Sequence, residues 1–273
     1  MSAEAPPLAA PARGRDPLKI VMPLVVGLLF LGLWEAVVRL FDIPPYLLPG
    51  PWLVARTLVD DWGLLFDALL VTLQVTVSAF VLAVLGGGAL AVLFTRSRWI
   101  EFSLYPYAVI LQVTPVVAIA PLIIAWVKDA YLAMLICAWI VAFFPVLSSA
   151  TLGLASADHN LLDLFQLYGA SRRQVLWFLR VPGAMPYFLG GLRIAGGLAL
   201  IGAVVAEFVA GTGGTNTGLA YRILEAGYRL QIPRMFAALL LIAATGILIF
   251  LLLSLLSHLI LRRWHESAVR REH

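Results

Sequence analysis

Long runs of apolar residues dominate the chain and determine its predicted elements. A helix needs about 20 consecutive apolar residues to cross the hydrocarbon core of a bilayer, and runs of that length recur along the whole sequence. We predict an all-α membrane protein with six transmembrane helices, at residues 20–41, 68–94, 103–127, 130–153, 187–211 and 235–261.

The composition supports this fold class and excludes others. Of the 273 residues, 62% are hydrophobic and only 12% are charged, whereas soluble domains carry roughly 25% charged and 45–50% apolar residues. The surplus of apolar surface excludes a soluble enzyme, a disordered chain and a disulfide-stabilised scaffold. The single cysteine, Cys137, cannot form an intrachain disulfide.

The distribution of Lys and Arg predicts the orientation. With the N-terminus in the cytoplasm, the inner segments hold twelve of the 19 basic residues, the outer segments five, and Arg39 and Arg193 lie within spans. This bias follows the positive-inside rule and places both termini in the cytoplasm. We expect a disordered cytoplasmic tail at 1–17, a membrane domain at 18–264 and a cytoplasmic tail at 265–273.

The longest inner loop, at about 153–186, carries a local folding signal. An apolar stretch that begins at Leu161 predicts a short helix, and Gly169 suits the left-handed position that ends one. Ser171 and Gln174 then match a capping box, which predicts a second helix from Arg172 to about Arg180, ending before Pro182. Such an exposed amphipathic corner either docks onto a partner or lies flat on the lipid headgroups.

Polar residues inside the predicted spans are candidates for the transport pathway. Glu207 shares a helix face with small residues, so it points into a helix interface or a cavity, either as a gate or as a structural acid. Gln112 and Thr114 lie in the third span beside Pro115, where the missing backbone donor predicts a kink that frees carbonyls toward a cavity.

Motifs for chemistry are missing from the sequence. Lys19 and Lys128 are the only lysines and neither belongs to a P-loop, and the glycine-rich run at 211–218 has Asn216 at the third position of a dinucleotide-binding fingerprint. The four histidines are scattered. We therefore expect no catalytic residue, no metal site, no cofactor and no nucleic-acid partner.

The inner loop resembles the signature of permease subunits of binding-protein-dependent ABC importers, which reads E-A-A, three residues, G, nine residues, I-x-L-P. With Gly169 on its glycine, residues 179–182 (Leu-Arg-Val-Pro) fall on the last element, and 163–165 (Asp-Leu-Phe) keep the acid of the first. The motifs at 169–172 (Gly-Ala-Ser-Arg), 191–193 (Gly-Leu-Arg) and 46–49 (Tyr-Leu-Leu-Pro), the Pro115 to Leu122 motif and Glu207 are similar to the nitrate/sulfonate/taurine branch. Val127-Lys128-Asp129 and Ala220 depart from the pattern of that branch.

The resemblance implies a type I importer permease fold, non-catalytic, in the inner membrane of a bacterium. It implies that the loop is a coupling helix that docks into a cytoplasmic ATPase dimer, which binds the ATP. The implied coupling residues are Asp163, Leu164, Phe165, Tyr168, Gly169, Ala170, Ser171, Arg172, Arg173 and Pro182, and the implied translocation path contains Gln112, Thr114, Pro115 and Glu207.

The resemblance also implies further partners: a substrate-binding protein outside the membrane, a second permease copy that forms a homodimer with this one, and the membrane lipid. The solute would be a sulfonate, taurine or nitrate-type anion, or a pyrimidine-like vitamin precursor. The alternative is an ion-coupled secondary transporter, for which inverted repeats or several buried carboxylates are expected. Glu35 and Glu207 are the only acids in the predicted spans.

Overall fold

The computed structural model describes residues 18–210 and 217–262, and this part of the chain contains helices and no strand. The tails at 1–17 and 265–273 and most of the glycine-rich run lie outside the described residues. The helices are α1 (Leu18–Leu40), α2 (Pro51–Asp60), α3 (Trp62–Arg96), α4 (Arg98–Val113), α5 (Val116–Trp126), α6 (Ala130–Ala155), α7 (His159–Leu167), α8 (Arg172–Val175), α9 (Val181–Ala210), α10 (Leu219–Tyr228) and α11 (Ile232–Leu261), with a π turn at Leu176–Arg180.

The predicted spans all fall on these helices, but one of them is not a single helix. Five described helices are long and apolar enough to cross a membrane, and α4 with α5 passes the same test as a pair bent by 101°. The bend predicted at Pro115 is therefore present, as a break between two helices. Pro115 lacks a backbone donor and disfavours helical backbone at the residue before it, and Thr114 and Pro115 are both extended, with ψ 121° and 116°.

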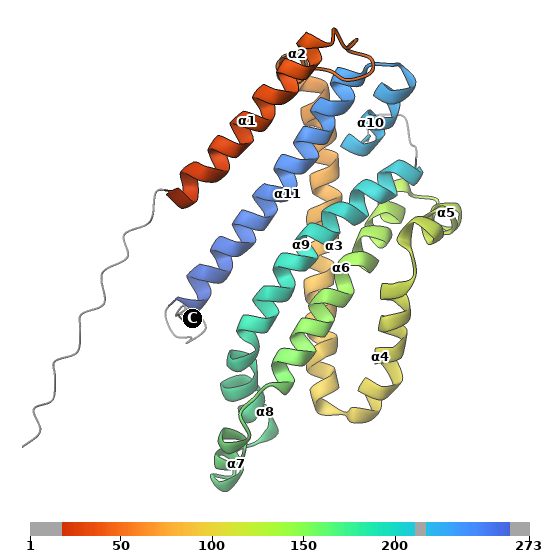
Figure 1. The fold of residues 1–273 in the computed structure, drawn as a ribbon. Coiled ribbons are helices and arrows are strands. Elements are labelled where there is room, and N and C mark those ends of the chain that lie inside the picture. Colours follow the sequence, from red (N-terminus) through yellow and green to blue (C-terminus); the bar gives the residue numbers. More distant parts are fainter. Residues whose placement is uncertain (1–17, 211–216, 263–273) are drawn as a thin grey trace, which may run out of the picture.

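The helices run alongside one another between two distinct ends (Figure 1). α2 and α10 lie at one end, which we call the α10 end, and α7 and α8 lie at the other, the α7 end. α3, α6 and α9 occupy the centre, with α4 and α5 on one side and α1 and α11 on the other. The described chain begins and finishes toward the α7 end, in agreement with an even number of crossings.

Small residues hold the central helices close together. A Cβ atom on Gly202 of α9 would lie 2.8 Å from the Ala138 Cα atom of α6, and one on Gly191 would lie 2.5 Å from the Ser149 Cβ atom. Neither position accepts a larger side chain without separating the helices. Close backbone approach of this kind is how helices associate in a membrane, where lipid removes most of the hydrophobic driving force.

α1 is held mainly at its C-terminal part. Arg39 pairs with Glu35 one turn earlier, with Nε and Oε1 2.7 Å apart, and the other Glu35 oxygen accepts the Trp52 backbone N–H at the start of α2, at 3.4 Å. The Trp34 ring packs on Phe236 of α11, with centroids 5.9 Å apart. The remainder of α1 exposes its apolar side chains, as expected for a helix surrounded by lipid.

Candidate functional site

The corner at the α7 end begins with a fully formed helix stop. Gly169 has φ +66°, and its N–H donates to the Gln166 carbonyl at 2.9 Å, while the Ala170 N–H donates to the Phe165 carbonyl, also at 2.9 Å. These two bonds constitute a Schellman motif, which satisfies carbonyls that the end of α7 would otherwise leave unpaired. Gly169 therefore turns the chain sharply between α7 and α8.

α8 starts with the capping box that the sequence predicts. The Ser171 Oγ atom accepts the Gln174 N–H at 3.3 Å, and Gln174 Oε1 accepts the Ser171 N–H at 2.7 Å. At the start of α7, the Asp158 side chain accepts the Asn160 N–H at 2.8 Å. The corner is therefore ordered by local bonds at each of its helix ends.

The second helix of the corner does not end before Pro182, and this expectation was wrong. α8 passes through the π turn directly into α9, and Pro182 is the second residue of α9. The Val181 N–H donates to the Leu176 carbonyl, five residues back. The wider turn accommodates the missing donor and the ring of the proline at the start of the next helix, so helical backbone runs from Arg172 to Ala210.

The corner presents large side chains to its surroundings. Leu167 and Tyr168 are 85% and 84% exposed, and Trp177 and Phe178 are also exposed. A pocket of about 480 Å³ lies between α7 and the π turn, lined by Leu164, Phe165, Tyr168, Gly169, Ala170, Gln174 and Phe178. The structure therefore brings five of the ten predicted coupling residues together around one concave surface. Asp163, Ser171, Arg172 and Arg173 are exposed outside its lining, and Pro182 lies in α9.

Glu207 lies near the α10 end of α9 and is 2% exposed. Its Oε2 atom accepts the Ala220 N–H at 3.0 Å, and Thr72 Oγ1 of α3 accepts the Leu219 N–H at 2.9 Å. Gly218, the residue that precedes α10, has no side chain to cap it. Glu207 and Thr72 therefore cap α10 from two other helices, which favours the structural alternative for this acid.

The other predicted pathway residues lie at the break between α4 and α5. Gln112 and Pro115 are exposed and Thr114 is half-buried, and Thr114 Oγ1 donates to the Ile110 carbonyl at 2.7 Å. No hydrogen bond among the described residues joins Glu207 to these side chains. The predicted pathway thus separates into a buried clamp at Glu207 and an exposed polar site at the break.

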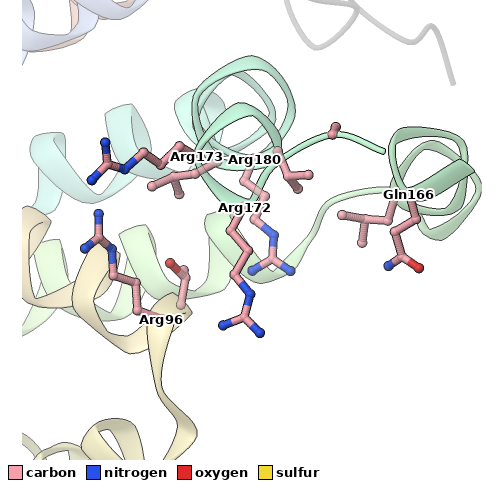
Figure 2. A pocket seen from close by; sticks show the side chains of 10 residues that line it. Arg96, Gln166, Arg172, Arg173 and Arg180 are labelled. Atoms are coloured by element: carbon pink, nitrogen blue, oxygen red, sulfur yellow. The ribbon is translucent and has the colours of Figure 1, made fainter. Parts of the chain in front are cut away.

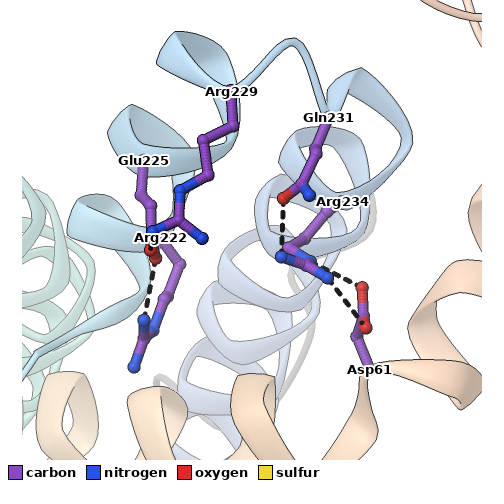
Figure 3. A network of polar contacts seen from close by, with 6 residues as sticks. All are labelled: Asp61, Arg222, Glu225, Arg229, Gln231 and Arg234. Carbon is purple, nitrogen blue, oxygen red and sulfur yellow. Dashed lines mark hydrogen bonds and ion pairs between the residues drawn. The ribbon is translucent and has the colours of Figure 1, made fainter.

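A polar network at the α10 end was missed by the sequence analysis (Figure 3). Arg234 of α11 donates to both oxygens of Asp61, at 2.6 and 3.0 Å, and to Gln231 Oε1 at 2.6 Å. Glu225 of α10 accepts from Arg222 at 2.8 Å and pairs with Arg229 at 3.0 Å. The pKa of Glu225 is lowered mainly by the hydrogen bond that it accepts from Arg222.

Arg193 of α9 also makes a contact that the sequence does not indicate. It donates to Ser257 Oγ of α11, and Ser257 is buried. Within the described residues, no group of three His, Cys, Asp or Glu side chains could hold a metal ion, and Cys137 is buried among apolar side chains. The candidate site therefore consists of surfaces for docking and helix packing, and the described residues contain no metal-binding cluster.

Comparisons with known proteins agree with this geometry. The family described as "Binding-protein-dependent transport system inner membrane component" matches residues 83–266. A riboflavin transport system permease protein of Chloroflexus aurantiacus is 34% identical, over 89% of this chain and 90% of its own. A taurine transport system permease protein of Escherichia coli is 31% identical, over 92% and 93%. The crystal structure of an amino acid ABC transporter with histidines has a TM-score of 0.60 at 21% identity, over 76% of this chain and 97% of that one.

Proposed function

Because this chain belongs to the family of binding-protein-dependent transport system inner membrane components and is a non-catalytic ABC importer permease of the sulfonate/nitrate/taurine branch, we propose that it conducts a small solute across the inner membrane. A substrate-binding protein delivers the solute on the outer side. A separate cytoplasmic ATPase dimer binds and hydrolyses the ATP.

The ATPase binds the corner at the α7 end, which consists of α7, the turn at Gly169 and α8. The observation that carries this assignment is the combination of order and exposure: the Gly169 Schellman motif and the Ser171 capping box fix the backbone, while Leu167 and Tyr168 remain exposed. A rigid element with exposed apolar side chains suits docking into a groove. The described chain begins and finishes toward this side, which the excess of Lys and Arg assigns to the cytoplasm.

The solute passes between two copies of the chain. Gln112 is exposed near the middle of the bent α4–α5 span, and a polar side chain that faced lipid there would be costly. A water-filled cavity between two copies removes that cost. The α4–α5 break therefore lines the path, and Thr114 and Pro115 contribute backbone that is not bound into a helix.

The solute is a small heterocycle of the vitamin-precursor type, with a sulfonate-type anion as the other candidate. Arg193 lies within a predicted span and donates to Ser257, so it is already engaged by a neighbouring helix. A neutral heterocycle needs no fixed positive charge along its path. Uptake of labelled riboflavin or an aminopyrimidine into proteoliposomes, compared with taurine and nitrate, distinguishes the two classes.

The coupling role is tested by changing only the backbone preference at residue 169. A Cβ atom there would meet nothing within 4 Å, so substitutions act through φ alone. Gly169→Val opposes a left-handed φ, because β-branched residues are genuine outliers there, whereas Gly169→Asn tolerates it. We expect Gly169→Val to lose solute-stimulated ATP hydrolysis and co-purification of the ATPase, while Gly169→Asn keeps both.

Gly183→Val is the matched control, because Gly183 has equally open surroundings on α9 but ordinary helical φ. It should leave the association with the ATPase intact. Full uptake and full ATPase association in Gly169→Val would refute the coupling role of the corner. If the chain alone, without any ATPase, took up solute when an ion gradient was applied, this would instead favour a secondary transporter.

A further inference from the structure

A second cavity at the α7 end is lined by four arginines. It has a volume of about 580 Å³ and lies between the end of α3, the corner and the π turn. Figure 2 shows Arg96 extending from α3 and Arg173 from α8, with Arg172 and Arg180 pointing into the same region and Gln166 contributed by α7. Four positive charges around one cavity repel one another unless an anion lies between them.

The four arginines have no acidic partner among residues 18–210 and 217–262. Five arginines elsewhere in the described chain each pair with a carboxylate: Arg39, Arg56, Arg222, Arg229 and Arg234. The four cavity arginines form no such pair within the described residues. Within the same described residues, the buried Arg180 Nε atom also has no hydrogen-bond partner. Guanidinium groups pair bidentately with carboxylates and phosphates, so the cavity has the chemistry of an oxyanion site.

A separate apolar groove is lined by residues that neighbour those of the cavity on α3 and at the π turn. It has a volume of about 230 Å³. On α3 it is lined by Gly88 and Val92, within one to two turns of Arg96, and on the other side it starts at Trp177 and Val181, next to Arg180. Its other lining side chains are also apolar: Ala150, Leu154, Ala184, Met185 and Phe188. The ligand that fits both parts is amphiphilic.

The Arg96 end of the cavity lies at the level of a membrane surface. Between Asp67 and Arg96, α3 contains no charged residue, and this stretch is about 42 Å long at 1.5 Å per residue. A bilayer with its headgroup regions is about 40–45 Å thick. Arg96 therefore lies among the lipid headgroups when Asp67 lies at the opposite surface, and Trp99, 83% exposed, follows at the level where aromatic belts form.

We propose that the four-arginine cavity binds the phosphate headgroup of an anionic phospholipid, with one acyl chain in the groove beside Gly88. Under the proposed orientation, this lipid belongs to the cytoplasmic leaflet, where basic pockets between helices recognise such headgroups. A free phosphate ion would use the same arginines but not the groove. The lipid connects α3 to the corner and the π turn, two parts that the chain itself joins by no ion pair among the described residues.

The test measures lipid that stays with the full chain. The protein is reconstituted in vesicles of equal amounts of phosphatidylglycerol and phosphatidylcholine, extracted into mild detergent, and its retained lipids are quantified by mass spectrometry. We expect phosphatidylglycerol to be enriched. Arg96→Gln, at an exposed position, should lower its retention about fivefold, which corresponds to about 1 kcal/mol per basic residue near a lipid surface. Arg98→Gln, two residues away and outside the cavity lining, should retain it.

The groove has its own pair of variants. A Cβ atom on Gly88 would meet only Phe188, at 3.9 Å, so Gly88→Leu should fold and fill the groove. It should lower retention with all arginines present, while Gly190→Leu, an open position on α9 outside the groove, should not. Helical circular dichroism and size-exclusion profiles check that each variant is folded.

Other outcomes overturn the proposal. Equal retention of phosphatidylglycerol and phosphatidylcholine would refute an anionic lipid site. Displacement of the lipid by inorganic phosphate, together with normal retention in Gly88→Leu, would show a free oxyanion site. Loss of ATPase co-purification in Arg96→Gln, with unchanged lipid retention, would assign the arginines to an acidic protein surface.

Discussion

Glu207 and Ala220 are 13 positions apart, on two different helices, and the Glu207 carboxylate accepts the Ala220 N–H at 3.0 Å. The bond fixes the first turn of α10 to the end of α9. The other Glu207 oxygen, Oε1, is buried and has no hydrogen-bond partner among the described residues. The position of α10 therefore depends on a side chain at the far end of the helix that starts from the corner.

Removing the Glu207 acceptor should loosen α10. Glu207→Ala leaves the Ala220 N–H without its partner, and the loss of a buried hydrogen-bond partner costs about 1–3 kcal/mol. Glu207→Gln keeps an amide oxygen as acceptor and should cost less. Hydrogen exchange of amides 219–223 should be faster in Glu207→Ala than in Glu207→Gln, and exchange on α7 should be unchanged. Equal protection in both variants would contradict a clamp at this site.

Gly218 and Glu207 should show strong non-additivity. A Cβ atom on Gly218 would overlap the Glu207 carboxyl group, so Gly218→Ala should lower the thermal stability of the purified protein. In a Glu207→Ala background the overlap is gone, and the second substitution should cost little. A double-mutant cycle on melting temperatures measures this coupling. Additive effects would mean that Gly218 is required for another reason.

The corner backbone should depend on its capping box. Ser171→Ala removes the acceptor of the Gln174 N–H, and the loss of an N-cap side chain costs about 1 kcal/mol. We expect faster hydrogen exchange at amides 173–175 and weaker stimulation of the ATPase. Ser97→Ala is the control, since Ser97 precedes α4 without a side-chain capping bond. The same loss in both variants would argue against a specific role for the cap.

Two neighbouring aspartates should differ in their effect on stability. Asp61 pairs with Arg234 through both oxygens, and both side chains are about four-fifths buried. Asp60 pairs with Arg56 at 3.6 Å, with both side chains mostly exposed. Asp61→Asn should destabilise the protein by about 1.5–3 kcal/mol, the range for a hydrogen bond to a charged group. Asp60→Asn should stay within about 0.5 kcal/mol. Thermal unfolding in detergent compares them directly.

The Glu225 network predicts a loss of stability in acid. The hydrogen bond from Arg222 holds the pKa of Glu225 below its ordinary value of 4.5. Because the folded pKa lies below the unfolded one, this stabilisation is complete above pH 4.5 and is lost as the pH falls through the folded pKa. Glu225→Gln should reduce the drop in melting temperature over that acidic interval. An identical acid profile in wild type and variant would exclude this contribution.

Signals within a few residues were predictable from the sequence. Gly169 and the pair Ser171 and Gln174 each specify a bond between near neighbours, so the stop of α7 and the start of α8 follow from residue types alone. The apolar runs likewise predict the spans, because length and composition decide whether a helix can cross a bilayer. These parts of the candidate site needed no knowledge of tertiary contacts.

Contacts between distant segments could not be predicted in this way. The bond from Arg234 to Asp61 joins positions 173 apart, and nothing in either local sequence indicates the other. Pro182 was misjudged for a different reason: a proline breaks a regular helix, but a π turn before it lets the helix continue. The sequence places the bend at Pro115, because proline lacks a backbone donor, but it contains no information on its size of 101°.

Helical backbone runs without interruption from the corner at Arg172 to Ala210. The helix therefore fixes both the distance along its axis and the rotation around it between the corner and Glu207. One residue inserted between Arg180 and Glu207 would advance the carboxylate by about 1.5 Å and rotate it by about 100° around the helix axis, away from Ala220. We therefore expect an engineered one-residue insertion in this stretch to disrupt the Glu207 contact, and one in a connection such as residues 42–50 to leave it intact.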